Sequence, residues 1–184
     1  DYMHIRGSGL SIVWAYLSER NIVNMLLAAF AALVAISLVL LVALKRVDLG
    51  IISLVPNLTP ALLGFGLWAL FVGEVGLGLS VVSSMTLGIV VDDTVHFISK
   101  YLRYRKGMYP EPVDAIRHTF FLVGPAMAVT TIALVAGFLV LSFSDYKMSS
   151  DMGMLSALTV SIALVMDFLL LPALLLKLPN KLSA

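Results

Sequence analysis

Long apolar runs constrain the fold of this chain more than any other feature. Five of them, at about residues 22–44, 49–73, 79–99, 120–143 and 153–176, are long enough to cross a bilayer, since a spanning helix needs roughly 20 residues. Hydrophobic residues make up 60% of the 184 residues and charged residues only 12%, unlike an average soluble domain. Because lipid offers the backbone no hydrogen-bond partners, such runs are helical. The sequence therefore predicts an all-α membrane protein with five transmembrane helices.

The apolar runs divide the chain into three parts. We expect residues 1–21 to be an extracytoplasmic or interfacial segment, residues 22–176 to be the five-helix bundle, and residues 177–184 to be a cytoplasmic tail. The chain starts at Asp1 rather than at a methionine, which suggests that it is a piece of a longer protein.

Two short surface helices are expected beside the spans. In residues 10–18, one helical face gathers apolar side chains, with Trp14 suited to the membrane interface. This pattern predicts an amphipathic helix on the membrane surface, although a long first helix with protruding turns is an alternative. Residues 110–118 carry Pro112 and early acidic residues, which are helix-start signals, and predict a surface helix that leads into the fourth span.

The second apolar run contains two prolines, Pro56 and Pro60, near its start. Each proline removes a backbone donor and bends a helix. Within a membrane, the freed carbonyl groups need protein or water beside them. We expect a kinked span here rather than a re-entrant bend.

Basic residues indicate the orientation of the spans. If the first span runs from outside to inside, nine basic residues fall on the inner side and three on the outer side, an excess in the sense of the positive-inside rule. The C-terminus is then cytoplasmic, and we expect a multi-pass protein of the bacterial inner membrane. The inner residues are Lys45, Arg46, Lys100, Arg103, Arg105, Lys106, Arg117, Lys177 and Lys181, and the outer ones are Arg6, Arg20 and Lys147.

An adjacent pair of acids, Asp92 and Asp93, lies inside the third run, with His96 one turn later. A charged residue near the middle of a membrane costs roughly 2.5–3.5 kcal/mol on insertion-type scales, so these acids should face protein or water. Two neighbouring carboxylates in a low dielectric cannot both ionise cheaply, so one should hold a proton near neutral pH. We expect a proton-relay site directed towards the fourth span. The alternative is a structural pair held by hydrogen bonds to Thr94 or to neighbouring helices.

Small residues continue the stripe that carries the acids. Gly88, Asp92 and His96 are spaced at i, i+4 and i+8, and Ser84 lies one turn earlier. Small residues at this spacing let another helix approach closely. Gly88 and Ser84 are therefore expected to be helix-packing positions.

Four further polar residues in the spans have two interpretations each. His96 is either part of the relay or an interfacial histidine. Thr130 and Thr131, in the fourth run, are relay candidates, but threonine in a membrane helix usually bonds its own backbone. Asp167, in the fifth run, is expected to be a supporting polar residue that pairs across the bundle or with backbone.

Several motifs together resemble the resistance-nodulation-division (RND) transporters, most closely the MMPL and hopanoid-exporter branch, and the resemblance covers nearly the whole chain. The acid-bearing helix resembles the fourth or tenth transmembrane helix of these proteins. The motifs are Leu17-Ser18-Glu19-Arg20, Pro56-Asn57-Leu58-Thr59-Pro60, Gly88 with Asp92-Asp93-Thr94-Val95-His96-Phe97, Tyr101-Leu102-Arg103-Tyr104-Arg105, Pro112-Val113-Asp114-Ala115-Ile116, Thr130-Thr131 with Gly137-Phe138, and Asp167-Phe168-Leu169-Leu170-Leu171-Pro172-Ala173-Leu174.

The resemblance implies five of the six spans of one half of a transporter, following a large extracytoplasmic domain; the C-terminal half is favoured. By similarity, Asp92 and Asp93 would couple protons, with Thr130 or Thr131 opposite them. Many relatives have Asp-Tyr at the acid pair, whereas this chain has Asp93 at the second position. The implied partners are the remaining half of the transporter and its extracytoplasmic domains, a lipid or other hydrophobic substrate, the membrane, and, as an open option, a second copy of the chain.

Three functions compete on this sequence. The first is a proton-driven exporter of lipids or other hydrophobic molecules, a secondary transporter rather than an enzyme, with protons as the coupling ion and no cofactor or metal. The second is a sterol- or lipid-sensing or scaffold module that does not pump. The third is an intramembrane aspartyl protease, which would need Asp92 and Asp167 within sharing distance. The absence of cysteine excludes disulfides and thiolate metal sites in this stretch, and no nucleic-acid partner is expected.

Overall fold

A computed structural model describes residues 47–73 and 77–177 of the protein, together with separate residues between 20 and 38. Four helices are defined: α2 (Val47–Phe71), α3 (Leu77–Gly107), α4 (Pro112–Ser142) and α5 (Lys147–Leu176). The described residues include no strand, so the predicted all-α class is confirmed. The predicted amphipathic helix at 10–18 and the last residues of the tail lie outside the described residues.

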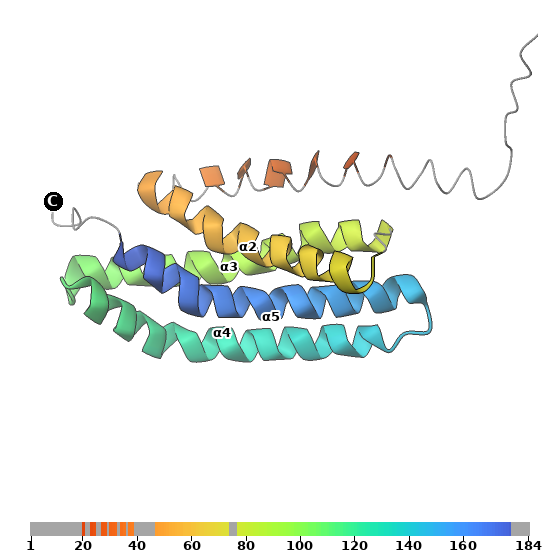
Figure 1. Ribbon diagram of the computed structural model, residues 1–184. Helices are drawn as coiled ribbons and strands as arrows, with labels where there is room; N and C mark the ends of the chain where they lie inside the picture. The colour runs from red at the N-terminus through yellow and green to blue at the C-terminus, as the bar shows by residue number, and fades with distance from the viewer. Residues whose placement is uncertain are drawn as a thin grey trace, which may run out of the picture.

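The four helices form an elongated bundle (Figure 1). Helices α2 and α4 run in one direction, and α3 and α5 return in the other, since short turns join consecutive helices. Helix α5 packs against each of the other three, whereas α2 and α4 do not contact one another. The central place of α5 brings Asp167, which lies in the second half of this helix, into the interior of the bundle.

Each of the four helices is long and apolar enough to cross a membrane. The candidate spans are Ile52–Phe71, Val81–Gly107, Pro112–Ser142 and Lys147–Leu176. Large apolar side chains stand on the outer surface, including Phe71 (85% exposed) and Phe121 (81% exposed), which water would not tolerate but lipid would. These features are those of a multi-pass membrane protein. In the predicted first span, 22–44, only separate residues are described, and these are helical.

Two local expectations need refinement. The surface helix expected at 110–118 is not a separate element, because α4 is continuous from Pro112 to Ser142. Pro112 suits this first position, where the proline's missing N–H would have no partner in any case. In α2, Pro56 and Pro60 lie inside an uninterrupted helix. The backbone therefore stays helical across both prolines.

The interior consists of two apolar clusters with a polar layer between them. The larger cluster includes Leu49 of α2, Tyr101 of α3 and Leu171 of α5. The smaller one holds Trp68, Val82 and Leu155 of the same three helices. Buried polar residues of all three helices lie between the two clusters, and three of them, Asn57, Thr94 and Asp167, are joined by short contacts through the Thr94 hydroxyl. Apolar packing on both sides thus encloses a polar layer in the centre of the bundle.

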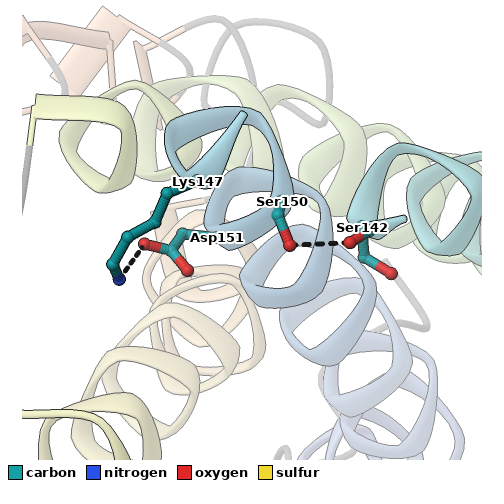
Figure 2. A network of polar contacts seen from close by, with 4 residues as sticks. All are labelled: Ser142, Lys147, Ser150 and Asp151. Carbon is teal, nitrogen blue, oxygen red and sulfur yellow. Dashed lines mark hydrogen bonds and ion pairs between the residues drawn. The ribbon is translucent and has the colours of Figure 1, made fainter. Parts of the chain in front are cut away.

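Helices α4 and α5 pack closely next to their connecting turn. A Cβ atom added to Gly153 would lie 2.6 Å from the Phe138 carbonyl oxygen, so only glycine allows this approach. Figure 2 shows that Ser150 Oγ donates a hydrogen bond to the Ser142 carbonyl oxygen (2.6 Å). One turn of α5 also carries an ion pair, Lys147 Nζ to Asp151 Oδ2 (3.0 Å), which is solvent-exposed and adds little stability. Backbone proximity therefore holds this hairpin together.

Candidate functional site

Three consecutive residues of α3 have three different surroundings. Asp92 is exposed, Asp93 is partly buried, and Thr94 is fully buried. Successive residues on a helix point about 100° apart, so one turn of α3 leads from an open surface to the core. The acid pair therefore lies where the bundle interior meets its surroundings.

Both acids line a pocket of about 710 Å³ between α3 and α4. Helix α3 contributes Asp92 and Asp93 from the turn that follows Gly88, and α4 contributes Thr130 opposite them. The acids thus share a pocket with residues of the fourth span. The remaining lining residues are apolar or small: Gly88, Ile89, Ala133 and Leu134.

Two ionisable residues lie close to Asp93 along α3. They are Asp92, next to it in the chain, and His96, about one turn later. His96 is exposed and lies one turn from the acids, outside the residues that line the pocket. Of these three ionisable residues of α3, only the two acids border the pocket.

The structure distinguishes the two candidate threonines of α4. Thr130 lines the pocket, and its hydroxyl lies 2.9 Å from the Met127 carbonyl oxygen and 3.1 Å from that of Ala126. Its single proton is used within its own helix, so its oxygen can still accept a hydrogen bond. Thr131 is 4% exposed and does not line the pocket. Of the two, only Thr130 faces the acids.

The packing role expected for Gly88 and Ser84 stays a prediction. A Cβ atom added to Gly88 would meet no atom within 4 Å, and Ser84 is exposed. No helix among the described residues packs on this stripe. A helix that uses it would have to come from another part of the protein.

Asp167 lies away from the pocket, in the polar layer of the core. It is fully buried, and its Oδ1 atom lies 2.8 Å from Thr94 Oγ1. Thr94 Oγ1 in turn lies 2.7 Å from Asn57 Oδ1 of α2. Asp167 therefore pairs across the bundle with Thr94. The Thr94 hydroxyl contacts Asp167, and not the neighbouring Asp92 or Asp93.

Sequence reasoning did not place Asn57 in a site. The signal available was a carboxamide between two prolines of an apolar span, where a polar side chain needs a buried partner. Asp92 and Asp167 are separated in the structure, since Asp92 borders the pocket and Asp167 is enclosed and bonded to Thr94. No hydrogen bond joins these two acids in the described part of the chain.

A second cavity, of about 780 Å³, lies near the turn between α3 and α4. Tyr109 and His118 border it, and their rings pack with centroids 4.9 Å apart. Neither cavity shows a metal-binding set, since the described residues hold no group of three His, Asp or Glu side chains placed to bind an ion. The other lining residues are Asp114, Arg117, Phe120, Phe121, Gly124, Pro125, Ala128 and Phe168.

Comparison with known proteins agrees with this architecture. The model of the MMPL family matches residues 3–181. A curated protein of Methanocaldococcus jannaschii, named "Putative membrane protein MJ1562", is 30% identical over 144 residues. This match covers 77% of the present chain and 36% of the relative, so the chain spans little more than a third of that protein's length. Because the family model extends over nearly the whole chain, this protein belongs to the MMPL family, within the RND superfamily of membrane transporters.

Proposed function

We propose that this chain is the membrane part of an exporter of lipids or other hydrophobic molecules that is driven by the proton-motive force. Asp92 and Asp93 would take up and release the coupling protons. The observation that carries the proposal is the pocket between α3 and α4, where both acids face Thr130. An ionisable residue within a membrane span marks a functional site by default, and a pocket gives protons and water a place to reach it.

The energetics of the pair suit a proton carrier. Asp92 is open to the surroundings, whereas Asp93 is partly buried beside it. Each charge moved through the membrane potential is worth about 2.3 kcal/mol per 100 mV. Proton transfer at this pair can therefore bias a conformational cycle of the bundle.

The proposed orientation places the C-terminus in the cytoplasm. The ends of α3 and α5 and the start of α4 lie at one end of the bundle (Figure 1). Arg105, Lys106, Arg117 and Lys177 lie at that end, and Lys147 lies at the other. By the positive-inside rule, the end rich in basic residues faces the cytoplasm of a cell whose cytoplasmic membrane holds the protein.

The proposed partners are the other half of the same transporter, its extracytoplasmic domains and a hydrophobic substrate. The open stripe at Gly88 and Ser84 supports a partner helix, because small residues there are not covered by the described helices. A lipid-sensing module without pumping is the alternative. The enclosure of Asp167 speaks against an aspartyl protease, which needs two acids around one water.

A transport assay on the full-length protein tests the proposal. The protein is reconstituted in vesicles with an imposed pH gradient, and export of a fluorescent lipid is followed together with internal pH. Asp92→Asn and Asp93→Asn should each lower proton-coupled export by at least about 100-fold, the scale of losing a positioned proton-transfer group. The physical reason is that a carboxamide cannot exchange a proton.

The matched control is Asp145→Asn, which changes an exposed acid in the turn between α4 and α5 and should leave export unchanged. All variants should elute as folded protein in size-exclusion chromatography. Export at the wild-type rate in both acid variants would refute proton coupling at this pair. Lipid binding without any gradient-driven export would instead favour the sensing module.

A further inference from the structure

In the buried layer formed by Asn57, Thr94 and Asp167, two short oxygen–oxygen contacts meet at one hydroxyl group. Thr94 and Asp167 have no exposed surface, and Asn57 is 2% exposed. Thr94 Oγ1 has three oxygen neighbours: Asn57 Oδ1 at 2.7 Å, Asp167 Oδ1 at 2.8 Å and the Val90 carbonyl at 3.3 Å. A hydroxyl group donates only one proton. One of the two short contacts therefore needs a proton from the other side.

Two arrangements supply the missing proton. In the first, Asp167 is protonated and donates to Thr94 Oγ1, and Thr94 donates to Asn57 Oδ1. In the second, Asp167 is ionised and accepts from Thr94, and the Asn57 carboxamide is turned so that its Nδ2 donates to Thr94. The two ends of a carboxamide are assigned from such networks, so both arrangements fit the same heavy-atom positions. Each contains two hydrogen bonds, and they differ by one proton.

The surroundings of Asp167 favour the protonated arrangement. Its Oδ2 atom is buried without a hydrogen-bond partner among the described residues, which is far costlier for a charged oxygen than for a neutral carbonyl. Helix α2 contains no basic residue, and the basic residues of α4 and α5, namely Arg117, His118 and Lys147, lie near the starts of those helices. On α3, the ionisable groups of that region are Asp92, Asp93 and His96.

We propose that Asp167 is a second proton-binding site of the bundle, held by Thr94 and Asn57 and separate from the pocket of Asp92 and Asp93. Release of its proton to water would turn the Thr94 hydroxyl from Asn57 to Asp167 and rotate the Asn57 carboxamide. The layer thus has two hydrogen-bonded states that differ in charge. Because its members belong to α2, α3 and α5, a change of state reaches three helices at once. A contribution of this site to export rests on the proposed function, whereas proton binding by Asp167 does not.

Infrared spectroscopy of the full-length protein in membranes tests the proposal, because a protonated carboxyl group absorbs apart from a carboxylate. At neutral pH, Asp167→Asn should remove a protonated-carboxyl band of the wild-type protein. Thr94→Val should shift that band to higher frequency, since the carboxyl group loses its hydrogen-bond partner. Thr86→Val is the matched control: Thr86 is equally buried on α3, but its hydroxyl donates to the Val82 carbonyl of its own helix (2.7 Å). This control should leave the band in place.

Infrared spectra of the Asp92→Asn and Asp93→Asn variants identify the bands that come from the two acids of the pocket. Loss of a carboxylate band in Asp167→Asn, with the protonated-carboxyl region unchanged, would overturn the proposal. If Asp167→Asn does not fold, the proposal is tested by comparing Thr94→Val with Thr86→Val. A protonated-carboxyl band at the same frequency in both variants would overturn the proposal. The same variants are also measured in the export assay. This distinguishes proton binding by Asp167 from proton-coupled export through Asp92 and Asp93. An Asp167 band in a protein whose export does not need Asp92 or Asp93 would support this site while refuting the proposed function.

Discussion

At the scale of single residues, the direction of each side chain decides its role more than its chemical type. Asp92, Asp93 and Thr94 follow one another on α3, yet they are exposed, partly buried and fully buried. The carboxylates border the pocket, and the hydroxyl belongs to the core. The pocket and the buried polar layer are therefore served by neighbouring residues of one helix, Asp93 and Thr94.

The neighbouring threonines of α4 offer a residue-scale prediction. Thr130→Val should lower proton-coupled export by roughly 2- to 13-fold, since losing one hydrogen bond costs roughly 0.5–1.5 kcal/mol and about 1.4 kcal/mol corresponds to tenfold in rate. Valine keeps the shape of threonine but offers the pocket no oxygen. Initial export rates in vesicles with an imposed pH gradient provide the measurement.

Thr131→Val is the control, because Thr131 is buried outside the pocket. It should keep its export rate within about twofold, less than the effect of one hydrogen bond. Equal losses in the two variants would show that the pocket does not distinguish these positions, and would contradict the role given to Thr130.

At the scale of helices, α5 holds the bundle together through close approach. It packs against α2, α3 and α4, and small residues let neighbouring backbones come near it. On the α2 side, a Cβ atom added to Gly64 would lie 2.5 Å from Thr159 Oγ1. On the α4 side, Gly153 faces backbone atoms of Phe138 and Ser142. This is the packing of small residues typical of membrane helices.

The contact at Gly153 predicts a loss of stability on a minimal substitution. Gly153→Ala should lower the free energy of unfolding by about 1–3 kcal/mol, the usual cost of overpacking, because the added methyl group meets backbone atoms that cannot rotate away. Thermal unfolding in detergent, followed by circular dichroism, measures the effect.

Gly137→Ala is the matched control on α4, where an added Cβ would meet nothing within 4 Å. Alanine is a better helix former than glycine by about 1 kcal/mol, so this variant should be as stable as the wild-type protein or more so. A Gly153→Ala protein as stable as Gly137→Ala would contradict the close approach of α4 and α5.

At the scale of the whole molecule, the bundle combines an apolar exterior with two polar regions. Lipid can cover the exposed apolar side chains of α2 and α4, and the pocket and the polar layer each gather ionisable groups near α3. The described helices leave the stripe at Gly88 open. The partner helix proposed above would pack on this open stripe.

Cysteine labelling tests the proposed orientation, and the 184 residues contain no cysteine of their own. Asp145→Cys, in the exposed turn after α4, should react with a membrane-impermeant maleimide in intact cells. Met108→Cys, 73% exposed in the turn after α3, should react only after the cells are permeabilised. We expect this difference because basic residues are more numerous near the turn after α3, and the positive-inside rule places that turn on the cytoplasmic side.

Both variants are made in a full-length protein whose other cysteines, if any, have been replaced. Labelling in denaturant controls for the reactivity of each thiol. Labelling of Met108→Cys alone in intact cells would show the opposite orientation.

Local sequence was sufficient for the helices and for the position of the acids. The apolar runs predicted α2, α4 and α5 as spanning helices, because hydrophobic length is a property of consecutive residues. It also located Asp92 and Asp93 on a spanning helix, and the role of these acids stays a prediction. It did not separate Thr130 from Thr131, which are chemically identical neighbours.

The sequence by itself determined that this chain is a helical membrane protein with a pair of acids in one span, because composition and spacing act within a single helix. Only the tertiary structure decided which polar residues meet. Thr94 and Asp167 lie 73 positions apart, and Asn57 joins them from a third helix. Such contacts depend on how each helix is rotated about its axis and on how closely its neighbours approach. Packing between helices sets both, and no single helix carries that information.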